Sequence, residues 1–236
     1  MRSARAIARL LPDVAEAIAR GDQPRLPELR GQAPVVLLQG FGASSRVLAP
    51  IARHLARELG RPVVRLPLGC RIPLHLGDVR QTARRVQLAL LRLARASDFA
   101  HVDVVGHSLG GLVATYLLKA LDRGQRIRRV VTLGTPHNGT PAALVGALLF
   151  GAFSRAVWQM IPGSPLLREL AALPVPAGSE LIALDSSGDA LVPTRFARPA
   201  PAANLARREL PGLGHVELLV SPLAFRAVQG ALREAA

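Results

Sequence analysis

Short apolar segments alternate with longer amphipathic segments along most of the chain, and this alternation restricts the fold more than any other feature. The short segments are rich in Val, Leu and Ile, as buried strands are, and lie at residues 35–38, 63–66, 101–105 and 128–133. The longer segments repeat apolar side chains at helical spacing and lie at residues 44–59, 78–96 and 109–121. This order predicts an α/β fold with a mostly parallel central sheet and helices on both faces.

The alternation is interrupted between Thr140 and Pro174 and then resumes with strands at 180–184 and near 208–210 and a helix at 222–234. We expect the insertion, at about 140–174, to form helices within one crossover connection. It suits either a groove for an acyl chain or ordinary packing of helices on the sheet, and the sequence leaves both open. Its large apolar residues are Leu144, Leu148, Leu149, Phe150, Phe153, Val157, Trp158 and Met160.

The length of 236 residues fits one domain, residues 1–236. Apolar residues near the N-terminus recur at helical spacing, which predicts an amphipathic helix at about 3–20 rather than a signal peptide. No stretch is long and apolar enough for a membrane span. Because the sequence shows neither a signal peptide nor a membrane span, we expect a cytoplasmic protein. Cys70 is the lone cysteine, which excludes an internal disulfide, so nothing in the sequence indicates an oxidising compartment.

The formal net charge of +14 raises the question of an acidic partner. The arginines are scattered and no nucleic-acid-binding motif accompanies them, so we expect no nucleic acid as partner. Transient contact with an anionic membrane surface stays open.

A glycine-flanked serine lies between a predicted strand and a predicted helix, in the run Gly106-His107-Ser108-Leu109-Gly110. This is the G-x-S-x-G pattern, in which a sharp strand-to-helix turn exposes the serine hydroxyl at the N-terminus of the helix. Such a turn forces the serine into a strained backbone conformation and leaves no room for side chains at the glycines. Ser108 is therefore the candidate nucleophile, against the alternative of a turn serine without chemistry.

A serine hydroxyl needs a base that a carboxylate orients, and in this fold the chain order is serine, acid, histidine. Only His215 lies downstream of both Ser108 and a strand-end aspartate, which makes it the candidate base. His137 ends a strand at the same edge of the sheet and is the competitor. Of the two strand-end aspartates, Asp189 has more room on its loop to reach the base than Asp185, which can instead cap the turn.

The remaining histidines are more plausible as structural or solvated groups: His54, His75, His101 and His107, the last packed beneath the serine turn. An oxyanion requires two backbone N–H groups, one after the nucleophile and one from the loop that follows an earlier strand. Leu109 and Phe41 are the candidates for these two donors. An ordinary glycine turn is the alternative for the loop that contains Phe41.

Several of these segments together resemble bacterial triacylglycerol lipases and esterases of the α/β-hydrolase superfamily, including the GPI inositol-deacylase-like group. They are VVLLQGFGAS, VDVVGHSLGGLVATYLLKAL, VVTLGTPHNGT, MIPGSPLLREL, DSSGDALVP and GLGHVELLVSP. The resemblance implies the α/β-hydrolase fold, a triad of Ser108, Asp189 and His215, an oxyanion hole from Phe41 and Leu109, and a helical lid formed by the insertion. The chain departs from the family where Gln39-Gly40 replaces the usual His-Gly.

These observations predict a carboxylic ester hydrolase, an esterase or lipase that acts through an acyl-enzyme on a small-molecule acyl ester or a lipid, with the length of the acyl chain left open. We expect it to need no metal and no organic cofactor. An acyltransferase or thioesterase would use the same triad and is one alternative. A catalytically silent lipid-binding protein that retains the fold is another.

Overall fold

The computed structural model describes residues 33–68, 77–97, 99–150 and 154–233. The helix expected at residues 3–20, Cys70 and His75 lie outside the described residues. Strands and helices alternate in the described part, and six strands form one sheet. The strands are β1 (Val35–Leu38), β2 (Val63–Leu66), β3 (Val102–His107), β4 (Ile127–Leu133), β5 (Glu180–Ser186) and β6 (Leu205–Leu210).

The sheet has the strand order β2-β1-β3-β4-β5-β6, and every neighbouring pair is parallel. The prediction of a mostly parallel sheet is therefore confirmed. The order reverses direction at β1, because β2 lies on one side of it and all later strands lie on the other. In open parallel sheets, ligands bind outside the carboxyl ends of the strands beside such a reversal, and Ser108 directly follows β3 there.

Successive residues of the central strands belong to two different apolar cores, one on each face of the sheet. Val36 and Leu38 of β1 belong to the first core, and Val35 and Leu37 belong to the second. All four side chains are fully buried, which explains why the strands are apolar throughout instead of alternating with polar residues.

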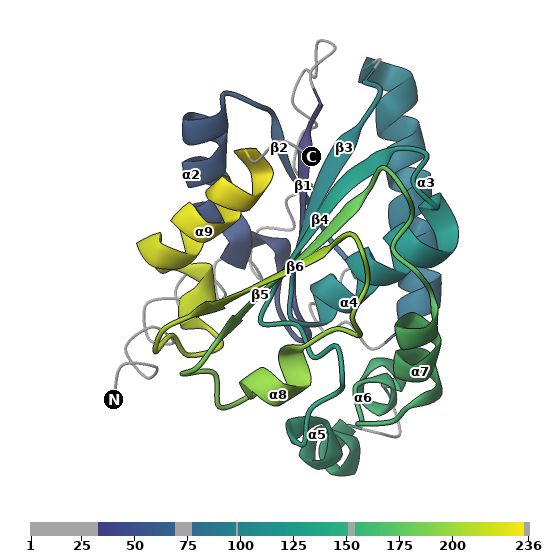
Figure 1. Ribbon diagram of the computed structural model, residues 1–236, viewed down its shortest axis with the longest axis vertical. Helices are drawn as coiled ribbons and strands as arrows, with labels where there is room; N and C mark the ends of the chain where they lie inside the picture. Colours follow the sequence, from purple (N-terminus) through teal and green to yellow (C-terminus); the bar gives the residue numbers. More distant parts are fainter. Residues whose placement is uncertain (1–32, 69–76, 98, 151–153, 234–236) are drawn as a thin grey trace.

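Helices cover both faces of this sheet (Figure 1). On one face lie α2 (Ala49–Leu59) and α9 (Pro222–Arg233), and on the other lie α3 (Val79–Ser97) and α4 (Leu109–Tyr116). Two predicted helices are divided in the structure. The segment 44–59 begins with the 3-10 turn η1 (Ser45–Leu48), and the segment 109–121 continues beyond α4 as the π-helix η2 (Leu117–Asp122).

The insertion between β4 and β5 contains three helices, α5 (Ala142–Phe150), α6 (Arg155–Gln159) and α7 (Pro165–Ala172). Polar contacts fix α6 and α7 to the body of the protein. Gln159 hydrogen-bonds to Asp78 and to the N–H of Val79, and Glu169 pairs with Arg80 of α3. The ammonium of Lys119, in η2, donates to the carbonyl of Leu170 at 2.9 Å.

The short helices α8 (Thr194–Ala197) and η3 (Glu217–Leu219) complete the order of elements. Figure 1 shows α8 at the same end of the sheet as the helices of the insertion. None of the helices in the described ranges combines the length and the apolar character that crossing a bilayer requires.

Candidate active site

The turn between β3 and α4 has the geometry that the glycine spacing predicts. Ser108 has φ 52° and ψ −122°, a strained conformation for a residue with a side chain. A Cβ added at Gly106 would lie 2.5 Å from the carbonyl oxygen of Gly110, and one added at Gly110 would lie 2.4 Å from the carbonyl oxygen of Leu38. Only glycine fits at both positions, so the turn can bring Ser108 to the N-terminus of α4.

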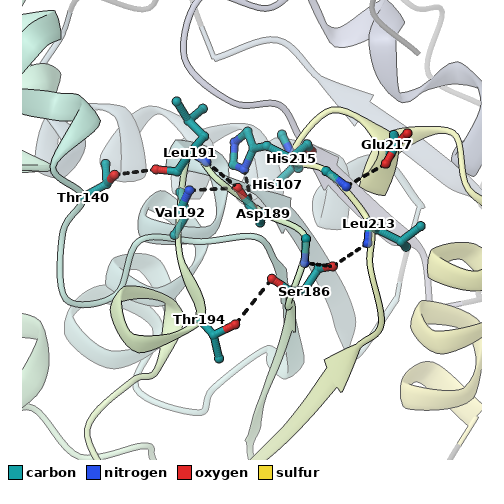
Figure 2. A network of polar contacts seen from close by, with 12 residues as sticks. His107, Thr140, Ser186, Asp189, Leu191, Val192, Thr194, Leu213, His215 and Glu217 are labelled. Atoms are coloured by element: carbon teal, nitrogen blue, oxygen red, sulfur yellow. Dashed lines mark hydrogen bonds and ion pairs between the residues drawn. The ribbon is translucent and has the colours of Figure 1, made fainter. Parts of the chain in front are cut away.

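The structure brings Asp189 and His215 together. His215 Nδ1 donates to Asp189 Oδ2 at 2.7 Å, and both side chains are nearly inaccessible to solvent (Figure 2). The second carboxylate oxygen of Asp189 accepts hydrogen bonds from the backbone N–H groups of Leu191 and Val192 at 3.0 and 2.8 Å. Three donors therefore hold the carboxylate, and a carboxylate in this position fixes the tautomer of the imidazole, which leaves Nε2 free to accept a proton.

Asp185, the alternative acid, has a different partner. Its carboxylate forms a 2.7 Å ion pair with Arg207 of the neighbouring strand β6. It is the sixth residue of β5, where the side-chain direction is set by the pleat of the strand. Asp185 is therefore engaged within the sheet, and Asp189 is the carboxylate that reaches His215.

Side chains outside the predicted set hold the loop of His215 in place. The hydroxyl of Ser186 accepts from the N–H of Leu213 at 2.9 Å, which joins this loop to the end of β5. Glu217 accepts from the N–H of Gly214 at 2.7 Å (Figure 2). The sequence signal for Glu217 is its position two residues after His215, at the start of η3, where an acidic side chain can satisfy a free backbone N–H.

His137, the competing base, lies in other surroundings. Its Nε2 is 3.0 Å from the hydroxyl of Thr132, with which it forms a buried hydrogen bond. Burial and, to a smaller extent, the positive charge of Lys119 lower the pKa of His137 to about 3. An imidazole that resists protonation so strongly is a poor general base at neutral pH.

The loop after β1 lies beside Ser108. A Cβ added at Gly40 would lie 3.0 Å from Ser108 Cβ, so the backbone that leads to Phe41 passes directly over the serine. Leu109 is the first residue of α4, and its N–H faces the N-terminal end of that helix. The two expected oxyanion donors therefore belong to two segments that both lie next to Ser108.

Gln39, which stands where the family usually has a histidine, forms hydrogen bonds that hold this loop. With its amide oriented to satisfy both partners, it donates to the carbonyl of Leu66 at 3.0 Å and accepts from the N–H of Leu68 at 2.9 Å. The side chain is buried, and it ties the loop to the end of β2. The departure from His-Gly thus leaves a hydrogen-bonded connection in place.

A pocket of about 360 Å³ opens beside Ser108. Phe41, Ser108 and His215 line it together with mostly apolar side chains, among them Val47, Met160 and Leu219. Helix α5 forms another part of its wall through Ala142, Ala143 and Gly146. In the ranges that the structure describes, no group of three or more His, Cys, Asp or Glu side chains is arranged to hold a metal ion.

The sequence profile of the PGAP1-like alpha/beta domain matches residues 79–158, which run from α3 through the serine turn to α6. No curated protein matches the chain in sequence. Many solved structures are similar in fold.

One similar structure is the lipase BlEst2 of Bacillus licheniformis in its mature form, with a TM-score of 0.70 and 18% identity, over 90% of this chain and 96% of that one. The product of the gene lin2722 of Listeria innocua has a TM-score of 0.67 and 19% identity, over 87% and 95%. Lipase B of Aspergillus fumigatus has a TM-score of 0.71 and 18% identity, over 89% of this chain and 54% of that one. The chain therefore shares the α/β-hydrolase fold with these structures, two of which are lipases, and its central part is similar to the PGAP1-like alpha/beta domain.

Proposed function

We propose that the protein is a serine hydrolase of carboxylic esters, with Ser108 as nucleophile, His215 as general base and Asp189 as the group that orients it. The observation that carries this proposal is the arrangement of the three residues. Ser108 and His215 line one pocket, and His215 Nδ1 donates to Asp189 Oδ2 at 2.7 Å. A serine on a strained turn at a helix N-terminus, together with a carboxylate-bound imidazole, is the arrangement that acyl transfer requires. The lipases of similar fold support the same reaction class.

In the proposed reaction, Ser108 Oγ attacks the acyl carbonyl while His215 Nε2 accepts the hydroxyl proton. The N–H groups of Phe41 and Leu109 stabilise the oxyanion of the tetrahedral intermediate. The protonated His215 then gives its proton to the leaving alcohol, which leaves an acyl group on Ser108. A water molecule releases the acyl group by the same steps, again with His215 as base.

The pocket favours an apolar acyl group. Apart from Ser108 and the two histidines, its wall is formed mainly by aliphatic side chains and by the small residues of α5. An acyl chain gains about 0.8 kcal/mol for each methylene that leaves water, so such a wall selects chains over short polar acids.

The surface beside the pocket is apolar as well and supports a lipid substrate. Helix α5 lines the pocket with Ala142, Ala143 and Gly146, whereas its residues Leu144, Val145 and Leu148 are exposed to solvent. We name five exposed apolar residues the rim. They are Leu144, Val145, Leu148, Trp158 and Leu191, and their exposed fractions are 51%, 58%, 87%, 53% and 48%. The rim and the high positive charge of the chain favour transient contact with an anionic lipid surface.

Hydrolysis of p-nitrophenyl esters from acetate to palmitate by the wild type and by Ser108→Ala tests the proposal. We expect the wild type to hydrolyse esters of medium or long chains and Ser108→Ala to lose the activity. Equal rates in both proteins would contradict the role of Ser108. Transfer of the acyl group to an added alcohol in preference to water would identify an acyltransferase, and preference for thioesters would identify a thioesterase.

A further inference from the structure

His107, the residue before Ser108, lies between the two segments that the proposed reaction must keep in register. Its Nε2 is 3.1 Å from the backbone carbonyl oxygen of His215. The two imidazole rings are 4.7 Å apart between centroids, at an angle of 47°. On the other side, a Cβ added at Gly40 would lie 3.1 Å from His107 Nδ1, so the loop that leads to Phe41 rests on the same ring.

These contacts define the tautomer of His107. A carbonyl oxygen only accepts hydrogen bonds, so Nε2 of His107 carries the proton and donates it to His215. Nδ1 is then an unprotonated acceptor, and it is buried without a hydrogen-bond partner in the described part of the chain. The side chain therefore makes one directional bond, and that bond goes to the backbone of the proposed base.

The imidazole of His107 is neutral, and it lies beside His215, which must become positively charged in the proposed reaction. Burial and, to a smaller extent, the neighbouring charge of His215 lower the pKa of His107 to about 3, although the bond to the carbonyl of His215 opposes the shift. A neutral ring in this place allows His215 to take the proton of Ser108 without repulsion from a second cation.

We propose that His107 is a positioning residue, which holds the backbone of His215 and the loop of Gly40 in the places that the reaction at Ser108 needs. This inference rests on the proposed function of Ser108 and His215. His107 does not exchange a proton with the substrate. It acts through the bond from its Nε2 to the carbonyl of His215 and through the contact of its ring with Gly40.

The matched pair His107→Gln and His107→Asn tests this role, because the two amides differ in reach. The side-chain nitrogen of glutamine can occupy the place of Nε2 and donate to His215, whereas that of asparagine lies near the place of Nδ1 and cannot. A small displacement of His215 strongly slows the proton transfer from Ser108. We therefore expect the kcat of His107→Asn to fall by about 10- to 100-fold, with KM little changed. We expect His107→Gln to retain kcat within about threefold of the wild type, because one bond of modest energy is kept.

Two further readouts separate positioning from a general loss of structure. The rate of labelling by a fluorophosphonate should follow kcat in both variants, since it reports attack by Ser108 alone. The low-field proton NMR signal of His215 Nδ1–H should stay sharp in His107→Gln and broaden in His107→Asn. His137→Gln serves as the control, because His137 is also buried but is hydrogen-bonded to Thr132 rather than to His215, and we expect the kcat of this variant per folded molecule to match the wild type.

Equal kcat and labelling rates in the wild type, His107→Gln and His107→Asn would overturn the inference, and so would an equal loss in both variants. If His107→Asn does not fold, His107→Met replaces it as the variant that lacks the donor. Failure of the proposed function has a different signature, because the wild type itself would then not react with the fluorophosphonate.

Discussion

Asp189 Oδ2 and His215 Nδ1 lie 2.7 Å apart, and both side chains are almost completely shielded from solvent. Asp185, four residues earlier, is equally buried but is paired with Arg207 at 2.7 Å. The two aspartates are similarly buried, but they differ in partner. This difference permits a direct comparison of their contributions to activity.

We expect Asp189→Asn to lower kcat by about 10⁴-fold, because an amide no longer fixes the imidazole in the tautomer that accepts a proton. Asp185→Asn removes a similar charge but leaves every bond of His215 intact. Its kcat per folded molecule should stay near that of the wild type, although its melting temperature should fall. Steady-state kinetics on a soluble ester, corrected for the folded fraction, checks both. A greater loss in Asp185→Asn than in Asp189→Asn would reverse the assignment of the acid.

The order of strands and helices could be predicted from the sequence because each element carries its own periodic pattern. The strands β1 and β2 and the serine turn lie where the patterns place them. The choice between Asp185 and Asp189 had to rest on loop length and resemblance, because the direction of a side chain at the end of a strand depends on which neighbour it meets. Arg207, on β6, is that neighbour for Asp185.

Contacts between segments that are distant in the chain could not be predicted, because they leave no local pattern in the sequence. The π-helix after α4 contains Lys119, whose ammonium reaches Leu170 in the insertion. The bond from His107 to His215 joins residues 108 positions apart in the chain. The amide of Gln39 bridges the carbonyl of Leu66, at the end of β2, and the N–H of Leu68. Each contact arises only when the sheet has brought these segments together.

Gly146 offers a test of where the acyl chain lies. It lines the pocket from α5, and a Cβ added there would lie 3.1 Å from Val157 Cγ1. Gly146→Leu should fill part of the pocket and shift the preferred ester to a shorter chain, with about a fourfold loss in kcat/KM for each methylene excluded. Rates over a series of p-nitrophenyl esters measure the shift.

The acetate ester is the internal control for Gly146→Leu, since its acyl group is too short to reach α5. We expect the rate on acetate to be unchanged. An unchanged chain-length profile would show that acyl chains lie elsewhere, and a uniform loss on all esters would point to a disturbed active site instead of a shortened pocket.

Leu148 is the most exposed residue of the rim, at 87%, and tests the contact with lipid. Leu148→Asp should weaken binding to phosphatidylglycerol vesicles by at least about tenfold, because it removes a side chain whose burial contributes about 1.5–3 kcal/mol. Vesicle sedimentation gives the affinity. Leu88→Asp, at an exposed position of α3 away from the pocket, makes the same change of charge and should bind nearly as the wild type does. Equal losses in both variants would assign the effect to charge alone.

The buried histidines predict how stability depends on pH. Burial lowers the pKa of both His107 and His137 to about 3, from an ordinary 6.5 in the unfolded chain. Between these values the unfolded chain binds a proton at each site and the folded protein does not. The free energy of unfolding therefore falls as the pH falls from about 6.5 to about 3, by about 1.4 kcal/mol per pH unit for each site.

His137→Gln removes one of these two sites, so its free energy of unfolding should decline less between pH 6 and pH 4, by about 2 kcal/mol, than that of the wild type. Urea unfolding at the two pH values measures the difference. Thr132→Val is the control, since it removes the hydrogen-bond partner of His137 but keeps the buried imidazole. It should be less stable at both pH values and retain the steep decline. A variant His137→Gln with the same pH dependence as the wild type would mean that His137 is already protonated in the folded protein at pH 4, and that burial does not keep it neutral.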